Sequence, residues 1–275
     1  MLSFREVSAK LQELKLPSEV PIIVHASLSK VGEIQGGADT MLGALFTLSN
    51  RLLLPTFTYK TMVVPPEGPE DNGLIYNTDH QVNPMASIFN PKLPADRSIG
   101  ILAEKFRLLP NAGRSCHPIF SFAATNFNEC LNAQTRKDPL APIRVLADQG
   151  GWVLLIGVDQ TSNTTIHYGE KLAGRRDYIR WALTDKGILE FPGYPGCSNG
   201  FDKITPVIQG MVRQIVLGNA TVLAIQAGYI IDVTRTLILS DPEALLCDRP
   251  ECLCCGSVRK DARAEIGGTN ARKAD

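Results

Sequence analysis

His167 and Glu170 lie three positions apart in residues 151–173, whose sequence is GWVLLIGVDQTSNTTIHYGEKLA. Residues with this spacing share one face of a helix, so the imidazole and the carboxylate can meet. A neutral imidazole titrates near pH ~6.5 and can take a proton from an attacking amine, while a carboxylate orients the ring and stabilises the imidazolium. The pair therefore indicates acid–base catalysis. The alternative is an ordinary helical pair, because a His–x–x–Glu spacing is common by chance.

The elements around this pair favour a ligand-binding position. The apolar run Trp152 to Ile156 predicts a buried strand, which Gly157 ends. The polar residues 159–164 supply turn and N-cap chemistry, so a helix is expected to begin near Thr164 or Thr165. Because α/β proteins bind ligands where a buried strand gives way to a helix, His167 is expected at such a site.

A second segment with chemistry is residues 24–32, VHASLSKVG, where a short strand leads into two serines, a lysine and a glycine. Backbone amides in such a loop, followed by a helix with Asp39 as its N-cap, can cradle phosphate or pantetheine groups. The loop lacks the Walker A pattern GxxxxGK[ST]. An ordinary strand and turn is the alternative, and the motif alone does not separate the two.

A third segment, residues 113–122 with the sequence GRSCHPIFSF, gathers an arginine, a histidine and two serines. A guanidinium and hydroxyl groups suit an anionic cofactor. The alternative is a structural turn in which His117 caps a backbone carbonyl.

Acidic side chains gather in residues 60–95, a long segment rich in Pro, Asn, Asp and Glu that is expected to be a lid or a disordered insertion. Such a lid would attract a cationic substrate, whereas a solvated loop is the alternative. The acidic candidates for substrate binding are Glu67, Glu70, Asp71 and Asp79, with Asp202 further along the chain.

Four cysteines fall within nine positions of the polar tail, residues 247–275, and are Cys247, Cys252, Cys254 and Cys255. Four thiols can bind zinc, but their spacing does not match the usual paired CxxC knuckles, so we favour unligated thiols and assign no metal ligand. Cys116, Cys130 and Cys197 are isolated in the sequence. An odd total of seven cysteines fits reduced thiols better than a disulfide framework.

Composition narrows the class of protein. The chain has 28 basic residues (Lys and Arg) and 28 acidic residues (Asp and Glu). No excess of basic residues is therefore available to bind a nucleic acid. No apolar run approaches the roughly 18–20 residues that span a membrane. The charged, amphipathic start is unlike a signal peptide, which predicts a cytoplasmic protein.

The pattern of apolar residues predicts an α/β fold. We expect a single domain over residues 1–275, with a mixed sheet whose central parallel-type strands are flanked by helices and whose late portion is largely antiparallel. The expected helices are residues 3–15, a helix from Asp39, 101–109, 138–149, a helix from residue 164, and 201–217. The expected strands are 22–24, 52–59, one within 113–126, 152–156, 175–184, 187–191, and pieces within 221–239. The last 15 or so residues are expected to be frayed.

Taken together, these stretches resemble the aminoglycoside N3-acetyltransferase family, also called the antibiotic N-acetyltransferase family. The resemblance covers roughly residues 20–240. The matching segments, in family order, are VHASLSKVGEIQGGADTMLGAL, LLLPTFTY, GRSCHPIFSFAA, DPLAPIRVLADQGGWVLLIGV and TTIHYGEKLAG.

The resemblance implies transfer of an acetyl group from acetyl-coenzyme A to an amine of an aminoglycoside, at the 3-N position, and hence a role in antibiotic resistance. The family histidine and glutamate match His167 and Glu170. The implied partner is a cationic small-molecule amine, and the implied state is a monomer or homodimer. The residues assigned to the cofactor are His25, Ala26, Ser27, Leu28, Ser29, Lys30, Val31, Gly32, Thr58, Arg114, Ser115, His117 and Ser121.

The expected mechanism is direct transfer without an acetyl-enzyme, with His167 as general base. A backbone amide or a hydroxyl of Thr56, Thr58 or Ser115 is expected to stabilise the oxyanion. One alternative is a coenzyme A-dependent acetyltransferase for another small amine or amino sugar, with little aminoglycoside activity. An alternative of another class is a non-catalytic protein that binds zinc or a partner. A hydrolase is disfavoured because the chain has no G-x-S-x-G elbow.

Overall fold

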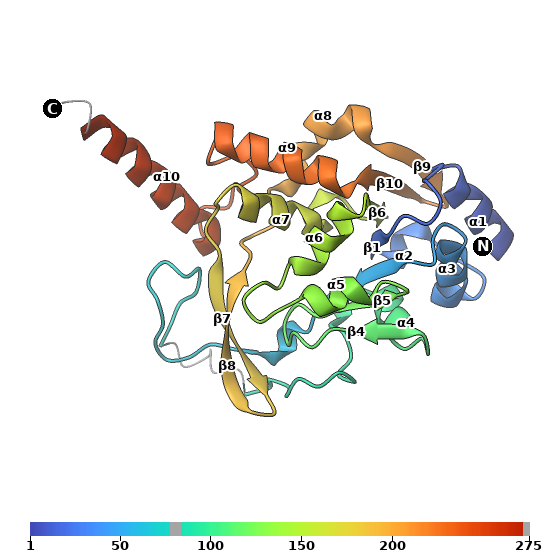
Figure 1. Ribbon diagram of the computed structural model, residues 1–275, viewed down its shortest axis with the longest axis horizontal. Helices are drawn as coiled ribbons and strands as arrows, with labels where there is room; N and C mark the ends of the chain where they lie inside the picture. The colour runs from blue at the N-terminus through green and yellow to red at the C-terminus, as the bar shows by residue number, and fades with distance from the viewer. Residues whose placement is uncertain (78–83, 272–275) are drawn as a thin grey trace.

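A computed structural model of the chain describes residues 1–77 and 84–271, with side chains as far as residue 264. A seven-stranded mixed sheet has the order β4-β5-β2-β1-β6-β10-β9, and a second sheet has the order β3-β7-β8 (Figure 1). The strands are β1 (Ile22–Ala26), β2 (Leu52–Pro55), β3 (Met62–Val63), β4 (Ala112–Arg114), β5 (Phe122–Thr125), β6 (Trp152–Ile156), β7 (Tyr178–Thr184), β8 (Gly187–Tyr194), β9 (Arg213–Leu217) and β10 (Ala220–Gln226). The central strands β2, β1 and β6 are parallel, and β4, β5, β9 and β10 pair antiparallel. The predicted α/β class with a mixed sheet is confirmed.

The central strands are apolar because helices cover the sheet on both faces. The helices are α1 (Phe4–Gln12), α2 (Leu28–Val31), α3 (Gly37–Phe46), α4 (Ile101–Arg107), α5 (Asn128–Ala133), α6 (Ala141–Asp148), α7 (Thr164–Leu172), α8 (Thr205–Ile208), α9 (Ala227–Ser240) and α10 (Leu253–Ala271). One hydrophobic cluster includes buried side chains of α1, α3 and α4, and the other includes those of α5, α6, α7 and α9. In Figure 1, α10 projects away from this body.

The pairing of β1 with β6 fixes the position of the site. Their register sets His25 beside Leu155 and Ala26 beside Ile156. Because the two strands are parallel, the loops that follow their carboxyl ends lie next to each other. The register therefore brings the segment after residue 26 to the segment that precedes α7.

Local sequence signals decided several helix boundaries. Ser3 and Glu6 form the predicted capping box of α1, and Asn163 caps α7 by accepting a hydrogen bond from the amide of Thr165. The prediction that Asp39 caps the next helix is wrong. The N-cap is Gly36, whose φ of +79° favours glycine, and Asp39 lies in the first turn of α3.

The late part of the chain departs from the predicted elements. The helix predicted over 201–217 ends early, because its last residues form β9 at the sheet edge; residues 201–211 form η4 (Phe201–Ile204), α8 and η5 (Gln209–Met211). The strand-like pieces predicted within 221–239 divide into β10 and the helix α9. The β-branched residues of α9 hid its helical period, whose buried side chains include Ile230, Thr234 and Ile238. The prediction that the last 15 or so residues are frayed is wrong as far as residue 271, where α10 ends, and residues 272–275 lie outside the described chain.

The second sheet borders the acidic segment. The hairpin β7–β8 has its predicted turn at residues 185–187, and β3 adds to its edge. Asn72 accepts a hydrogen bond from the amide of Ile179 and donates to its carbonyl, which ties the segment to β7. Two further short turns of helix are η1 (Tyr59–Thr61) and η2 (Arg97–Ile99). Within the described residues, no helix is both long and apolar enough to span a bilayer.

Candidate active site

A cavity of about 760 Å³ opens where the carboxyl ends of β1 and β6 meet. Its size lies in the range of small-molecule sites. The lining includes residues 24–29, 54–55, Phe57, Tyr59, 97–103, Phe120, Val158, 161–164, His167 and 194–199. The predicted cofactor loop after β1 and the predicted ligand-binding segment at the start of α7 therefore line the same cavity.

His167 is part of a chain of three side chains. Its Nδ1 lies 2.6 Å from Glu170 Oε2, and the other carboxylate oxygen, Oε1, accepts a hydrogen bond from Arg175 Nη1 at 2.8 Å. Arg175 Nη2 also donates to the carbonyls of Pro242 and Ala244, at 2.8 and 2.7 Å. The predicted His167–Glu170 contact is present, and Arg175 holds the carboxylate from behind.

This arrangement determines which histidine nitrogen is free. An ionised carboxylate only accepts hydrogen bonds, so the contact with Glu170 assigns a proton to His167 Nδ1, and in a neutral imidazole Nε2 then has the lone pair. The side chains of Glu170 and Arg175 are 7% and 4% exposed, against 11% for His167. The imidazole packs edge-on against Phe201, with ring centroids 4.6 Å apart. The ring is therefore held on two sides, by Glu170 at Nδ1 and by Phe201 at its edge.

The approach of the two loops depends on Gly157 at the end of β6. Its φ is +64°, and a Cβ there would lie 2.8 Å from the Lys30 Cβ and 3.0 Å from the Ser27 carbonyl oxygen. A larger residue would push the loop after β1 away from the junction. The glycine thus permits the close approach of residues 27–30 to the end of β6.

Residues 25–29 of the predicted cofactor loop line the cavity. The hydroxyls of Ser27 and Ser29 lie 3.2 Å apart. His25 is buried, which lowers its pKa to about 3. Its Nε2 has no hydrogen-bond partner among the described residues. The rest of the predicted loop turns away from this space: Lys30 is exposed, Val31 is in the core and Gly32 approaches Asn219.

The guanidinium of Arg114 donates hydrogen bonds to groups within the protein. Its Nε lies 3.2 Å from the hydroxyl oxygens of Thr56 and Ser121, and Nη2 donates to the Thr56 carbonyl at 2.8 Å. Nη1 donates to the carbonyls of Pro91, at 3.1 Å, and Leu93. The guanidinium therefore joins the end of β2 to residues 91–93.

The other polar residues of this group also bond within the protein, except that the buried Nε2 of His117 has no hydrogen-bond partner among the described residues. The Ser115 hydroxyl accepts the amide of Phe122 at 2.9 Å, and the Thr58 hydroxyl donates to the Pro118 carbonyl at 2.5 Å. His117 Nδ1 accepts from the amides of Ile119 and Phe120, so the alternative in which it caps a carbonyl is wrong. Burial lowers the pKa of His117 to about 3. Of the residues the structure describes, the cavity lining includes no member of this set: Thr56, Thr58, Arg114, Ser115, His117 and Ser121.

The predicted acidic residues lie elsewhere on the surface. Glu67 and Glu70 are exposed, Asp71 forms an ion pair of 2.5 Å with Lys260, and Asp202 accepts a hydrogen bond from the Thr205 hydroxyl. Asp79 lies outside the described residues. As far as the described chain goes, the cavity lining contains Arg97 and no carboxylate.

Three contributors to the site are absent from the residues predicted from the sequence. Arg175 follows Glu170 by five residues in EKLAGRR, and this nearby cation was a usable signal. Arg97 and residues 194–199 reach the cavity from segments distant in sequence, and no local pattern marks them.

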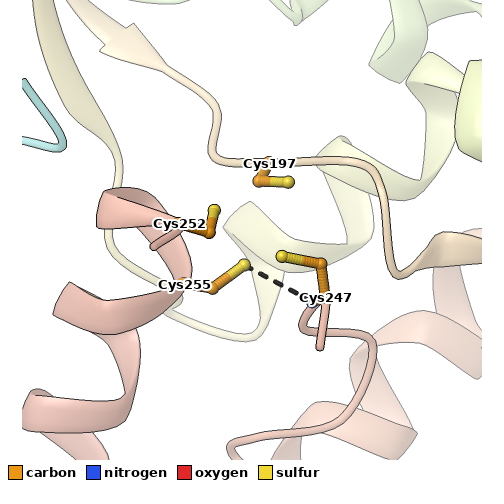
Figure 2. A group of neighbouring side chains, drawn as sticks. All are labelled: Cys197, Cys247, Cys252 and Cys255. Carbon is orange, nitrogen blue, oxygen red and sulfur yellow. Dashed lines mark hydrogen bonds between the residues drawn. The ribbon is translucent and has the colours of Figure 1, made fainter. Parts of the chain in front are cut away.

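The cysteines are grouped differently from the prediction. Cys197, expected to be isolated, joins Cys247, Cys252 and Cys255, while Cys254 lies apart from them. Figure 2 shows the four side chains converging from the loop after β8, the loop before α10 and the start of α10.

Comparison with known proteins gives one family. Residues 23–238 match the family model described as aminoglycoside 3-N-acetyltransferase. The prophage-derived aminoglycoside N(3')-acetyltransferase-like protein YokD of Bacillus subtilis is 28% identical over 60% of this chain, and aminoglycoside N(3)-acetyltransferase VII of Streptomyces paromomycinus is 32% identical over 60%. The matched stretches span 64% and 60% of these relatives' own lengths.

Solved structures show the same fold. The apoenzyme of aminoglycoside acetyltransferase AAC(3)-IVa superimposes with a TM-score of 0.77 at 22% identity, covering 94% of this chain and 97% of that one. A structure of AAC-IIIb with CoASH superimposes with a TM-score of 0.68 at 21% identity, covering 86% and 96%. Another structure of AAC(3)-IVa, with a TM-score of 0.72 at 22% identity over 94% and 97%, is in complex with a gentamicin.

Proposed function

The chain belongs to the aminoglycoside 3-N-acetyltransferase family, and we propose that it transfers an acetyl group from acetyl-coenzyme A to an amine, with His167 as the general base. The observation that carries this proposal is the His167–Glu170–Arg175 chain at the wall of a 760 Å³ cavity. It combines an imidazole nitrogen that makes no contact with Glu170, a buried carboxylate partner for the imidazolium, and a cavity that the histidine lines.

The reaction follows from the chemistry of the groups. The amine, once unprotonated, attacks the thioester carbonyl carbon, and a C–N bond forms. His167 Nε2 takes the proton that the nitrogen sheds, while Glu170 stabilises the resulting imidazolium. The tetrahedral intermediate then breaks its C–S bond, and the coenzyme A thiolate leaves and takes up a proton. No acetylated side chain is needed, because an amine and a thioester bound next to each other can react directly.

Groups along the cavity suit the donor. Arg97 and the hydroxyls of Ser27 and Ser29 can bind phosphate or pantetheine oxygens. The amides at the start of α7 favour negative charge, which suits the developing oxyanion. A bound substrate also supplies a partner for the unsatisfied Nε2 of His25. A relative's structure contains CoASH, which agrees with this use of the cavity.

The acceptor we propose first is an aminoglycoside, acetylated at its 3-amino group. The family and a relative solved with a gentamicin support this choice. The position in the cavity that remains for it is the side formed by residues 194–199, next to His167.

A second candidate is a different and less cationic small amine or amino sugar. The observation that favours it is the charge of the wall: the described lining has an arginine and no carboxylate. A polycation binds best where carboxylates offset its charge.

The test is an acetyl-transfer assay in which the protein is incubated with acetyl-coenzyme A and either an aminoglycoside or a simple amine. The acetylated product is measured by mass spectrometry. The product readout avoids a background from the seven cysteines of the protein. His167-dependent acetylation of an aminoglycoside supports the first candidate, and His167-dependent acetylation of simple amines alone supports the second. Failure to bind acetyl-coenzyme A in calorimetry would refute both.

A further inference from the structure

The Sγ atoms of Cys197, Cys247, Cys252 and Cys255 all lie within 4.8 Å of one another. Tetrahedral zinc with Zn–S bonds of about 2.3 Å sets its sulfur atoms about 3.8 Å apart, so the cluster needs only a small contraction to bind the ion. A disulfide requires a separation of about 2.05 Å, and all four residues are free thiols.

The four residues belong to one built pocket. Cys247 and Cys255 are 2% and 1% exposed, and they form a small hydrophobic cluster with Leu246 and Val258 against which Cys197 and Cys252 pack. This burial shields Cys247 and Cys255 from water, whereas Cys197 and Cys252 are partly exposed. A closed site with four protein ligands and no open position is the arrangement of structural rather than catalytic zinc.

The sequence spacing also fits once the correct pair is chosen. Cys252 and Cys255 form a C-x-x-C pair, which the adjacent Cys254 had obscured. The side chain of Cys254 points to Gly73, where an added Cβ would lie 2.6 Å from its sulfur, and Tyr178 donates to its carbonyl. Cys254 therefore faces away from the cluster.

The surroundings of the sulfur atoms suit a negatively charged metal–thiolate group. The amide of Cys247 donates to Cys255 Sγ, and the amide of Asn199 donates to Cys197 Sγ, each at 3.4 Å (Figure 2 draws the first). Such hydrogen bonds to the ligand atoms are the usual outer support of a metal site. Arg259 lies beside the cluster, where it donates to the Cys247 carbonyl at 2.5 Å.

From this geometry we propose that Cys197, Cys247, Cys252 and Cys255 bind one structural zinc ion. The ion connects two parts of the molecule and adds to contacts already present there, such as the hydrogen bond from Tyr178 to the Cys254 carbonyl and the ion pair of Arg176 with Asp261. Cys197 belongs to residues 194–199, which line the cavity, whereas Cys252 and Cys255 flank the start of α10, which extends from the body of the protein. Zinc thus fixes one wall of the cavity to the C-terminal helix. The site is independent of the proposed reaction.

The first test is the metal content of the full chain, purified from zinc-supplemented cells and measured by inductively coupled plasma mass spectrometry. We expect about one zinc per chain in the wild type and in Cys254→Ser, and less than about one-fifth of that in Cys255→Ser. Cys254 is the matched control because it is the neighbouring residue and points away. A wild type that stays below about one-tenth of a zinc per chain after reconstitution with zinc and a reductant would overturn the proposal, as would equal losses in the two variants.

The second test identifies the ligands in the wild type and does not depend on whether a variant folds. X-ray absorption at the zinc edge is expected to give four sulfur atoms at about 2.3 Å. A shell of nitrogen or oxygen at about 2.0–2.1 Å would refute the site, as would a disulfide between any two of the four cysteines in freshly purified protein. Both tests are made without turnover, so their failure is distinct from failure of the proposed acetyl transfer.

Discussion

The β6–α7 junction and residues 113–122 both place a histidine beside hydroxyl side chains and an arginine. The junction presents its histidine and hydroxyl residues to the cavity, whereas residues 113–122 contribute only Phe120 to the cavity lining. At the junction, Arg175 binds Glu170, which in turn binds His167, and one imidazole nitrogen remains for a substrate. In residues 113–122, Arg114 bonds to backbone carbonyls and hydroxyls, and His117 accepts two backbone amides.

The difference shows that residue type alone does not define a site. A polar side chain serves a ligand only if the protein leaves one of its donors or acceptors unpaired and accessible. The junction satisfies this condition because a helix start and a cavity meet there. Residues 113–122 use the same chemistry to hold the ends of β2 and β5 together.

The largest expected effect separates the two histidines. His167→Ala should lower kcat by about 10²- to 10⁴-fold, the usual contribution of a general base, with acetyl-coenzyme A binding retained. His117→Asn should change kcat of the folded enzyme less than about tenfold, because His117 acts through backbone contacts. Steady-state kinetics with calorimetry measures both. If His117→Asn binds acetyl-coenzyme A more weakly than the wild type, His117 contributes to cofactor binding and the structural role is contradicted.

The next effect concerns Arg114 as a structural residue. Arg114→Met should lower the free energy of unfolding by about 2–4 kcal/mol, because several buried acceptors lose a charged donor. Lys105→Met is the control, since Lys105 forms an exposed ion pair with Asp39 and should cost at most about 1 kcal/mol. Urea unfolding gives both values. Equal stability of the two variants would remove the structural role of Arg114.

A smaller effect is expected at the carboxylate of the junction. Glu170→Gln should lower kcat about ten- to a hundredfold, because the amide keeps the shape but stabilises the imidazolium less. The substitution retains an oxygen that can accept from Arg175, so circular dichroism and Tm should change little. A kcat within twofold of the wild type would show that Glu170 only packs against the ring.

The last prediction concerns the acid sensitivity of the buried imidazole of His117. Its folded-state pKa of about 3 lies below the value of about 6.5 expected on unfolding. The unfolded chain therefore binds the proton first, and stability is lost as the pH falls from about 6.5 to about 3, by at most about 1.4 kcal/mol per pH unit. Urea unfolding at several pH values should give a flatter dependence for His117→Asn than for the wild type. Parallel curves would show that His117 is not buried as a neutral group.

Much of the fold was predictable because its signals are local. The buried strand β6, the Asn163 cap of α7 and the spacing of His167 and Glu170 all depend on residues within one or two turns of each other. The elements after residue 200 were harder to predict from the sequence. The β-branched residues of α9 suit strands and helices alike, and only packing against α7 selects the helix.

The candidate site was predictable only in part. The contact between His167 and Glu170 followed from the sequence, since an i, i+3 contact needs nothing beyond a helix. Tertiary structure alone decided that Arg114 has its donors occupied, that Arg97 and residues 194–199 reach the cavity, and that Cys197 meets three cysteines some fifty residues away. The physical reason is that strand order and loop packing set such long-range contacts, and whether a polar group is free for a ligand depends on partners that its own neighbourhood in the chain does not contain.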